Sequence, residues 1–325
     1  MNILVCDDSA LARKSLSRCL DAYSGLDLYF AKHGKEAIKR LEKTNIDLLF
    51  LDLTMPVMDG FEVLERMPVN SYPTQVVVIS GDVQKEAQKR CLMLGVSYFI
   101  EKPFLCEDVL GLVDRLGSGC VAPVTDSHKP RSAPLADVDA ISKFKEVTNI
   151  ALGQSAAIIS DHVGEFIQLP IPAVGVLDTG ELKMTIEDVM SRQGLHSVAQ
   201  RFVGGGIYGE ALVCMRGKGI ATLGKRLGFA QAESNDYETL LNVSNLLVSS
   251  YLNSLAHQLV LQFFLRQPII LDKKGREYAC AQHIEESAFA IEYTYFAEEL
   301  DFECEVLFLL DSSSVKAIYQ LMENF

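Results

Sequence analysis

Residues 49–60 read LFLDLTMPVMDG, an apolar run that ends on Asp52 and continues into a loop containing a proline and a glycine. A short apolar run bounded by turn residues is typical of a buried strand. The residues that follow, Gly60–Arg66, have the spacing of an amphipathic helix. This stretch therefore predicts a strand, a loop and a helix, with an aspartate where the strand ends.

The same alternation of apolar runs and helical patterns extends over the first 116 or so residues. Alternating strands and helices predict a parallel sheet with helices on both faces. The expected strands are Asn2–Cys6, Leu28–Phe30, Asp47–Leu51, Val76–Ile79 and Ser97–Ile100, and the expected helices include Ala10–Ala22, Lys35–Lys43, Gly60–Arg66 and Lys85–Leu94.

Chemically useful side chains stand at the carboxyl ends of four of these strands. Asp7 and Asp8 follow the first, Asp52 the third, Ser80 the fourth and Lys102 the fifth. In a parallel sheet these ends share one edge, where open α/β folds place their sites. Phosphoryl transfer to a carboxylate needs an exposed nucleophile, a metal and a cation for the phosphoryl oxygens.

Residues 1–117 resemble the CheY-like response-regulator receiver family in the DD pair, the DLTMPVMDG loop, the SG pair and KPF. The resemblance implies a doubly wound, five-stranded, flavodoxin-like fold. It implies that Asp52 is the phospho-acceptor, with a histidine kinase as phosphodonor. Mg²⁺ would be bound by Asp7, Asp8, Asp52 and the carbonyl of Thr54.

The same resemblance assigns three further positions. Lys102 would contact the phosphoryl group, and Ser80 would be the switch hydroxyl. Phe99 falls where the family has its switch aromatic, although a phenylalanine here is equally compatible with plain core.

The composition changes after Gly117, where GSGCVAPVTDSHKPRSAP carries no hydrophobic periodicity. This predicts a flexible linker over 118–136 between a receiver domain at 1–117 and a second domain at 137–325.

The second domain contains an internal repeat with an offset of 96 residues. Asn149 and Pro172 are separated by 22 residues, as are Asn245 and Pro268. At nearly the same offset, GEALVCM (209–215) is similar to CEVLFLL (304–310). The repeat predicts an α+β domain of two pseudo-symmetric halves, each a helix followed by strands.

Glu146 and Asn149 stand three residues apart and would share one face of a helix. Small residues (Gly153, Ala157 and Ser160) continue that face, and a polar pair on a flat surface suits insertion into a partner's site. The alternative is a solvated polar pair on an ordinary amphipathic helix.

The ExxN pattern, its spacing to the proline and its duplication resemble the CheC/CheX/FliY family of phosphatases, over residues 138–325. The family implies that Asn149 orients a water for attack on a receiver's aspartyl phosphate. Glu146 would form a salt bridge with that receiver's lysine. The second copy has Asn242 in place of the glutamate, beside Asn245. We expect one competent site, Glu146 with Asn149, and a weak or degenerate second site. Asn242 and Asn245 could alternatively form an unconventional site or a retained binding surface.

The bulk properties limit the function. A net charge of −13 argues against non-specific nucleic-acid binding, which needs a positive field. The sequence contains no run of about 18 apolar residues, so it predicts no membrane span. The cysteines are scattered without metal-ligand spacing, so we expect buried free thiols in a reducing cytoplasm. They are Cys6, Cys19, Cys91, Cys106, Cys120, Cys214, Cys280 and Cys304.

We considered three functions against these patterns. The first is a phosphatase, regulated by Asp52, that dephosphorylates a CheY-type response regulator or its own receiver; the family resemblance suggests chemotaxis or motility. The second is a non-enzymatic, phosphorylation-gated adaptor or phosphate sink that binds a receiver or a CheD-like partner. The third, a DNA-binding output, is disfavoured by the acidity and by the lack of a helix-turn-helix pattern.

Overall fold

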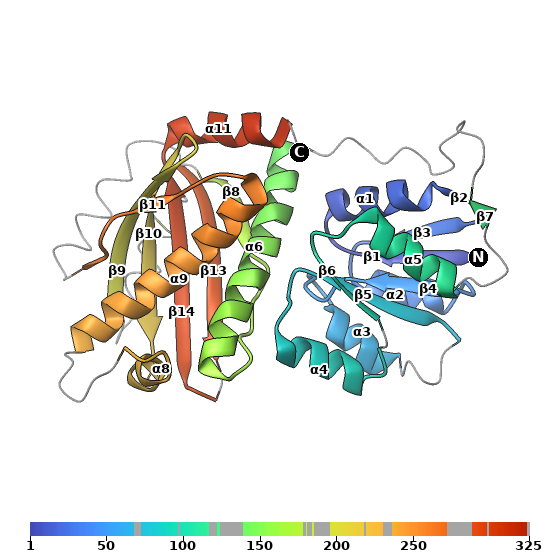
Figure 1. The fold of residues 1–325 in the computed structure, drawn as a ribbon, viewed down its shortest axis with the longest axis horizontal. Helices are drawn as coiled ribbons and strands as arrows, with labels where there is room; N and C mark the ends of the chain where they lie inside the picture. Colours follow the sequence, from blue (N-terminus) through green and yellow to red (C-terminus); the bar gives the residue numbers. More distant parts are fainter. Residues whose placement is uncertain are drawn as a thin grey trace. The chain divides into compact units, whose positions relative to one another are not determined.

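The fold is taken from a computed structural model and comprises two compact units, Met1–Glu146 and Val147–Phe325 (Figure 1). The structure describes residues 1–67, 73–96, 98–116, 122–123, 139–177, 180, 184, 196–217, 219–229, 236–271, 288–297 and 299–323. Among the described helices, none combines the length and hydropathy that crossing a bilayer requires.

The first unit is built on a five-stranded parallel sheet in the order β3-β1-β4-β5-β6. The sequence prediction of a doubly wound parallel sheet is confirmed. Its strands are β1 (Asn2–Cys6), β3 (Asp27–Ala31), β4 (Leu48–Leu51), β5 (Gln75–Ser80) and β6 (Tyr98–Glu101); Ser97, predicted to open the last strand, lies outside the described residues.

Helices cover both faces of this sheet, as Figure 1 shows. On one face α1 and α5 bury an apolar cluster with Ile3, Phe50 and Val77 of the central strands. Asp59 is the N-cap of the helix α3, and its side chain forms a capping box with that of Glu62. The helices are α1 (Ala10–Leu20), α2 (Gly34–Leu41), α3 (Gly60–Arg66), α4 (Lys85–Met93) and α5 (Cys106–Leu116).

Two residues of the predicted linker are ordered as a strand. β7 (Ala122–Pro123) pairs antiparallel with β2 (Tyr23–Ser24), a local pairing that the prediction of a flexible linker did not include. The pairing of these two strands rests on backbone hydrogen bonds, which leave no apolar periodicity in the sequence. The rest of 118–136 lies outside the described residues, and the predicted domain limits stay predictions.

The expectation of free thiols throughout is wrong for one pair of cysteines. Cys19 of α1 and Cys106 of α5 form a disulfide, with Cα atoms 5.2 Å apart. Their separation of 87 residues gives no sign of this, because the packing of α1 against α5 brings them together. Four cysteines are buried free thiols, as expected: Cys6, Cys91, Cys214 and Cys304. Cys120 and Cys280 lie outside the described residues.

The second unit contains a mostly antiparallel sheet in the order β11-β9-β10-β14-β13-β8, with β12 also paired to β9. Its strands are β8 (Ala173–Leu177), β9 (His196–Gly204), β10 (Ile207–Arg216), β11 (Phe264–Leu265), β12 (Ile269–Ile270), β13 (Ala288–Ala297) and β14 (Phe302–Leu310). The helices, the first of which starts within the first unit, are α6 (Ala140–Val163), α8 (Ile220–Arg226), α9 (Asp236–Leu259) and α11 (Ser312–Glu323).

The predicted repeat is visible in this topology. Each half has a long helix (α6 or α9) and a later hairpin, β9-β10 or β13-β14. The central strands β10 and β14 pair so that Leu212 faces Leu307, the residue equivalent to it in the repeat. The halves also exchange edge strands, because β8 pairs with β13 and β12 pairs with β9. Neither half therefore completes its sheet alone.

The long helices pack on one face of this sheet (Figure 1). The ring of Tyr251 on α9 lies 4.8 Å from that of Phe308 on β14. Between the helices, the Ser155 and Ser250 hydroxyls are 2.8 Å apart, and Ser155 Oγ is 2.8 Å from the Tyr295 hydroxyl. The opposite face carries a second apolar cluster, made of Ala199, Leu212, Cys214, Ala290, Leu307 and Leu309. The sheet is thus apolar on both faces.

Gly60 offers a test of the fold around Asp52. A Cβ on Gly60 would lie 2.3 Å from the carbonyl oxygen of Asp52, so we expect Gly60→Ala to destabilise the first unit by about 1–3 kcal/mol. A Cβ on Gly111, within α5, would meet no atom within 4 Å, and Gly111→Ala should stabilise by about 1 kcal/mol. Urea unfolding followed by circular dichroism measures both. Equal midpoints for the two variants would contradict this packing.

Candidate functional site

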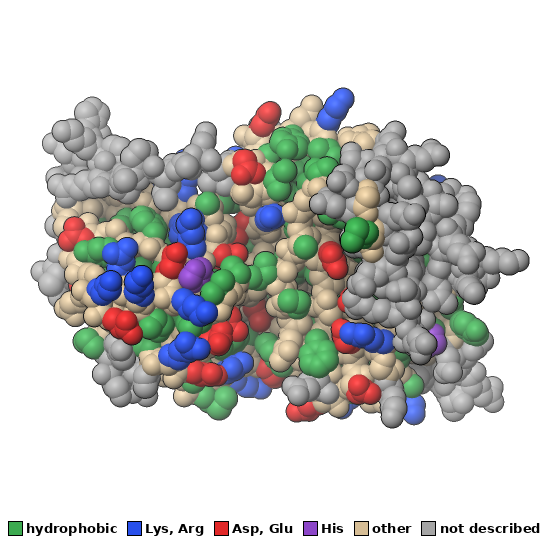
Figure 2. Space-filling model, turned by 180° about the vertical axis from the view of Figure 1, so that it is seen from behind, with side chains coloured by type: hydrophobic (Ala, Val, Ile, Leu, Met, Phe, Trp, Pro, Cys, Tyr) green, Lys and Arg blue, Asp and Glu red, His purple; other side chains and the backbone are tan. Residues whose placement is uncertain are grey.

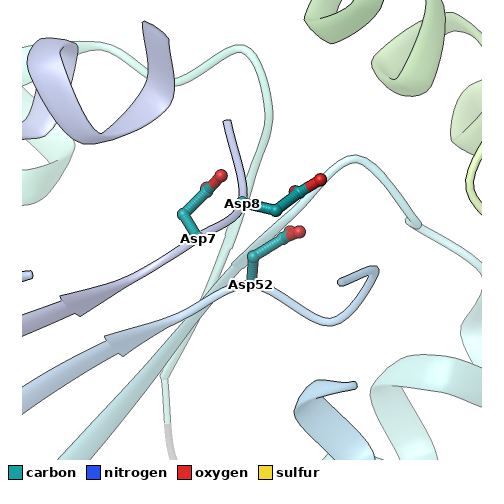
Figure 3. A group of neighbouring side chains, drawn as sticks. All are labelled: Asp7, Asp8 and Asp52. Carbon is teal, nitrogen blue, oxygen red and sulfur yellow. The ribbon is translucent and has the colours of Figure 1, made fainter. Parts of the chain in front are cut away.

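Three carboxylates meet at the carboxyl edge of the parallel sheet (Figure 3). Asp7 and Asp8 follow β1, and Asp52 follows β4. Because β1 and β4 are neighbours, with Cys6 level with Leu51, the aspartates that follow them are brought side by side. Ligand oxygens of the three side chains lie within 4.8 Å of one another. The geometry thus brings together three of the residues that the sequence predicted at this edge, and their roles stay predictions.

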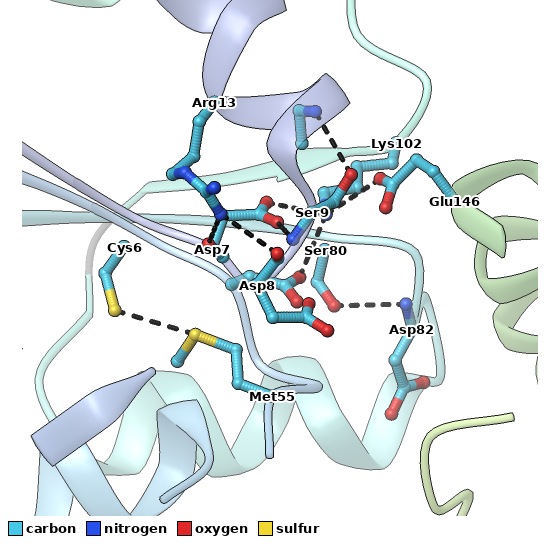
Figure 4. A network of polar contacts seen from close by, with 12 residues as sticks. Cys6, Asp7, Asp8, Ser9, Arg13, Met55, Ser80, Asp82, Lys102 and Glu146 are labelled. Atoms are coloured by element: carbon cyan, nitrogen blue, oxygen red, sulfur yellow. Dashed lines mark hydrogen bonds and ion pairs between the residues drawn. The ribbon is translucent and has the colours of Figure 1, made fainter. Parts of the chain in front are cut away.

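Lys102, which follows β6, supplies a buried cation to this cluster. Its Nζ lies 2.8 Å from Asp7 Oδ2 and 3.3 Å from Asp52 Oδ1, and the side chain is 2% exposed (Figure 4). Glu146, the last residue of the first unit, places Oε1 3.1 Å from the same Nζ. One ammonium group thus faces three carboxylates.

Arg13 holds the loop that carries Asp7 and Asp8, and the sequence analysis missed it. From α1, its Nη1 donates to the carbonyl of Asp7 at 2.6 Å and to that of Asp8 at 2.9 Å. The backbone N–H of Ser9 also donates to Asp7 Oδ1, at 2.8 Å. Nothing in the spacing marks Arg13, since a basic residue near the start of a surface helix is ordinarily solvated.

Ser80 lies at the end of β5, fully buried. Its Oγ accepts from the backbone N–H of Asp82 at 3.1 Å, and the carboxylate of Asp82 accepts from the N–H of Gln84 at 3.1 Å. Phe99 is half-buried on β6, and Thr54 is half-buried in the loop after Asp52. The roles predicted for Phe99 and for the Thr54 carbonyl stay predictions.

Burial sets the protonation of this site. It raises the pKa of Asp52 well above its usual value, although the nearby Lys102 opposes the shift. Burial and the Asp7 carboxylate raise the pKa of Asp8 to about 6. Burial lowers the pKa of Lys102, but Asp52 and Asp7 outweigh it, so the net pKa lies well above the usual value. The ammonium therefore stays charged, and the carboxylates favour a further cation.

The oxygens of Asp52 support that conclusion. Both are buried and have no hydrogen-bond partner among the described residues, although Lys102 is close enough for an ion pair. Closely spaced carboxylate oxygens are what Mg²⁺ prefers in proteins. Asp7, Asp8 and Asp52 thus fit a divalent cation.

The residues predicted for a second site lie on the two long helices. Glu146 and Asn149 are one turn apart on α6, where Glu146 is buried and Asn149 half-buried. The small residues beside them do not form an exposed face, because Gly153 and Ser160 are buried. Ser160 instead donates its hydroxyl to the carbonyl of Glu165 at 2.7 Å.

The equivalent pair on α9 differs. Asn242 is half-buried and Asn245 exposed. The amide oxygen of Asn245 accepts from Gln200 Nε2 of β9 at 2.7 Å, and the same Nε2 donates to the Arg266 carbonyl at 2.9 Å. Asn245 is therefore held against the sheet by a residue 45 positions away, which the repeat does not indicate.

Comparison with known proteins identifies the domain that carries the carboxylates. The family model of the response regulator receiver domain matches residues 3–114. Residues 3–114 form a response regulator receiver domain. A receiver domain takes its phosphoryl group from a histidine kinase, and the Asp7, Asp8 and Asp52 cluster is the acidic pocket where such domains bind Mg²⁺.

Relatives and solved structures match the receiver domain. The chain is 37% identical over 103 residues to protein-glutamate methylesterase/protein-glutamine glutaminase 3 of Rhodospirillum rubrum, covering 31% of this chain and 28% of that protein. The Bacillus subtilis protein-glutamate methylesterase/protein-glutamine glutaminase is 35% identical over 106 residues, covering 32% and 29%. The matched segment thus spans under a third of these relatives.

Two solved structures are also similar to about a third of this chain. The CheX-CheY-BeF3-Mg+2 complex from Borrelia burgdorferi is 33% identical with a TM-score of 0.33, covering 36% of this chain and 89% of that chain. A CheY-like receiver domain protein from Methanospirillum hungatei is 24% identical with a TM-score of 0.34, covering 36% and 93%.

The buried carboxyl of Asp82, two residues after Ser80, leads us to expect that the folding stability depends on pH. Burial raises the pKa of this carboxyl from 3.8 to about 6, so its ionised form disfavours folding. The wild type is relieved of that cost below pH 3.8 and bears it fully once the pH rises through about 6. We expect Asp82→Asn to be about 1–3 kcal/mol more stable at pH 7.5, because its carbonyl can still accept from Gln84.

Urea unfolding of both proteins from pH 4.5 to 7.5 measures this difference. It should shrink as the pH falls through about 6. A difference that stays constant over the range would show that the Asp82 carboxylate is not the cause.

Proposed function

We propose that the chain is a two-component signalling protein in which phosphorylation of Asp52 regulates a C-terminal aspartyl-phosphate phosphatase, the second domain predicted over residues 137–325. Its substrate would be a CheY-type response regulator or the chain's own receiver domain, in chemotaxis or motility. The observation that carries the proposal is the duplicated unit, whose two long helices, α6 and α9, present Asn149 and Asn245 at equivalent points of pseudo-symmetric halves.

In the receiver domain, Asp52 would be the phospho-acceptor. Asp7, Asp8, Asp52 and the carbonyl of Thr54 would hold Mg²⁺, which supplies positive charge to the phosphoryl oxygens. Lys102 is already within 3.3 Å of Asp52 Oδ1 and would contact a transferred phosphoryl group. Ser80 would turn its hydroxyl toward that group, with Phe99 following as the switch aromatic.

In the phosphatase site, the substrate receiver would bring its own aspartyl phosphate. Asn149 would orient a water in line with phosphorus through its side-chain amide. Glu146 would form a salt bridge with the lysine of that receiver. Within the first unit, Glu146 makes this type of contact with Lys102, at 3.1 Å. Catalysis would rest on orientation, since the metal and the leaving carboxylate belong to the substrate.

The second half-site would be inactive as a catalyst. Asn242 cannot form a salt bridge with a lysine, because it is uncharged. Asn245 is also engaged by Gln200, at 2.7 Å, so orienting a water would require breaking that bond. One competent site, Glu146 with Asn149, fits both observations.

A second candidate is a phosphorylation-gated adaptor or phosphate sink that binds a receiver or a CheD-like partner without hydrolysis. The Gln200–Asn245 bond favours it, because one half has already acquired a structural role. Nucleic acid remains a poor partner on charge grounds. On the described part of the face in Figure 2, Lys and Arg side chains are mixed with Asp and Glu, and the net charge is −13.

Release of inorganic phosphate from a phosphorylated CheY-type receiver tests the phosphatase. The full chain should accelerate release beyond the receiver's own decay. Asn149→Ala should reduce the acceleration by about 100-fold, because the attacking water loses its orientation. Asn245→Ala is the matched control and should keep the acceleration.

Release no faster than spontaneous decay would contradict the phosphatase. Binding of the phosphorylated receiver without such release would favour the adaptor. Full activity of Asn149→Ala would place catalysis elsewhere.

The lifetime of phosphorylated Asp52 separates action on the chain's own receiver from action on another protein. If the second unit hydrolyses this phosphate, the lifetime should be shorter in the full chain than in residues 1–117, and Asn149→Ala should lengthen it. Asp52→Asn is the control that removes the phosphoryl group. Equal lifetimes would leave only a separate receiver as substrate.

A further inference from the structure

The disulfide of the receiver domain joins a buried cysteine to an exposed one. Cys19 lies in the last turn of α1 and is 5% exposed, whereas Cys106 begins α5 and is exposed. The bond between them joins segments 87 residues apart. One sulfur is buried in the core and the other belongs to an exposed residue.

The segments that precede the two bridged helices both carry residues of the carboxylate site. The loop before α1 carries Asp7 and Asp8, and Arg13 of α1 donates to their carbonyl oxygens at 2.6 and 2.9 Å. The segment before α5 carries Lys102, four positions ahead of Cys106, with its Nζ 2.8 Å from Asp7. The disulfide is therefore a covalent tie between the helix that positions the acidic pair and the segment that positions its cation.

The other described cysteines of the first unit are poor competitors for this chemistry. Cys6 and Cys91 are buried, and burial raises the pKa of the Cys91 thiol to about 12. Thiols held protonated in this way are weak nucleophiles. The exposed Cys106 is the accessible end of the only described bond between cysteines.

We propose that Cys19–Cys106 is a redox-sensitive site through which a thiol reductant lowers the rate of phosphorylation at Asp52. A thiolate of the reductant attacks Cys106 Sγ, the bond between the two sulfurs breaks, and Cys19 leaves as a thiolate that takes up a proton. A second thiol of the reductant then displaces Cys106 from the mixed disulfide. The protein gains two thiols, and the reductant becomes a disulfide.

The physical reason is the loss of a constraint. With the bond intact, α1 and α5 cannot separate, and the Asp7, Asp8 and Lys102 loops keep their spacing. Without it, noncovalent contacts alone maintain that spacing: the Lys102–Asp7 ion pair and the apolar packing between the two helices, through residues such as Leu16 and Val109. Phosphoryl transfer depends on the placement of metal ligands and cation, so a looser site should react more slowly.

The test measures Asp52 phosphorylation in the full chain, using acetyl phosphate and Mg²⁺. Protein oxidised with diamide is compared with protein reduced with dithiothreitol, and mass spectrometry of alkylated peptides reports the state of Cys19 and Cys106. We expect the oxidised form to react about threefold faster or more, a coupling within the range that remote contacts exert on sites. Reoxidation should restore the rate.

Variants assign the effect to this bond. Cys19→Ser and Cys106→Ser should each be phosphorylated at the slower rate of the reduced wild type, both after diamide and after dithiothreitol treatment. Cys304→Ser, a buried thiol of the second unit, should remain redox-sensitive. Equal rates for the oxidised and reduced wild type would overturn the proposal, as would alkylation of Cys19 and Cys106 after oxidation. The assay uses no second receiver, so its failure is distinct from a failure of the proposed phosphatase.

Discussion

The buried ion cluster around Lys102 is the interaction on which the first unit's chemistry depends. Parallel pairing of β1 with β4 brings Asp7, Asp8 and Asp52 together at one edge of the sheet. Taking carboxylates out of water is costly, and removing one partner of a buried ion pair leaves an uncompensated charge. The Lys102 ammonium, 2.8 Å from Asp7, compensates part of that charge, and the remainder favours a divalent cation. The same imbalance that makes the cluster unfavourable on its own makes it a favourable place for a divalent cation.

Neighbouring elements keep this cluster in place. Arg13 donates hydrogen bonds to the backbone carbonyls of Asp7 and Asp8, and the Ser80 hydroxyl accepts one from the backbone N–H of Asp82. Gly60 allows the loop after β4 to fold back onto the carbonyl of Asp52, where a methyl group would not fit. These contacts fix the site through the backbone, so its geometry depends on Arg13 and Gly60 as well as on the residues proposed to take part in the chemistry.

The second unit obtains its stability in another way. Its halves exchange edge strands, with β8 completing the sheet beside β13 and β12 beside β9. Each half therefore needs the other to satisfy its backbone hydrogen bonds. A duplicated unit of this kind can keep its fold while one copy changes. The hydrogen bond from Gln200 Nε2 to Asn245 Oδ1 ties the asparagine of the second copy to β9.

The sequence by itself determined the parallel sheet, the residues at its carboxyl edge and the repeat of the second unit. These follow from local rules: apolar runs make buried strands, parallel strands share an edge, and equal spacings indicate equivalent elements. The tertiary structure alone decided the Cys19–Cys106 bond, the role of Arg13, the pairing of Ala122 and Pro123 with β2, and the binding of Asn245 by Gln200. Each of these joins positions through three-dimensional packing or backbone bonding. Neither packing nor backbone bonding leaves a periodicity or a spacing in the chain, which is why the sequence shows the residues at the sheet edge but not the contacts that hold them.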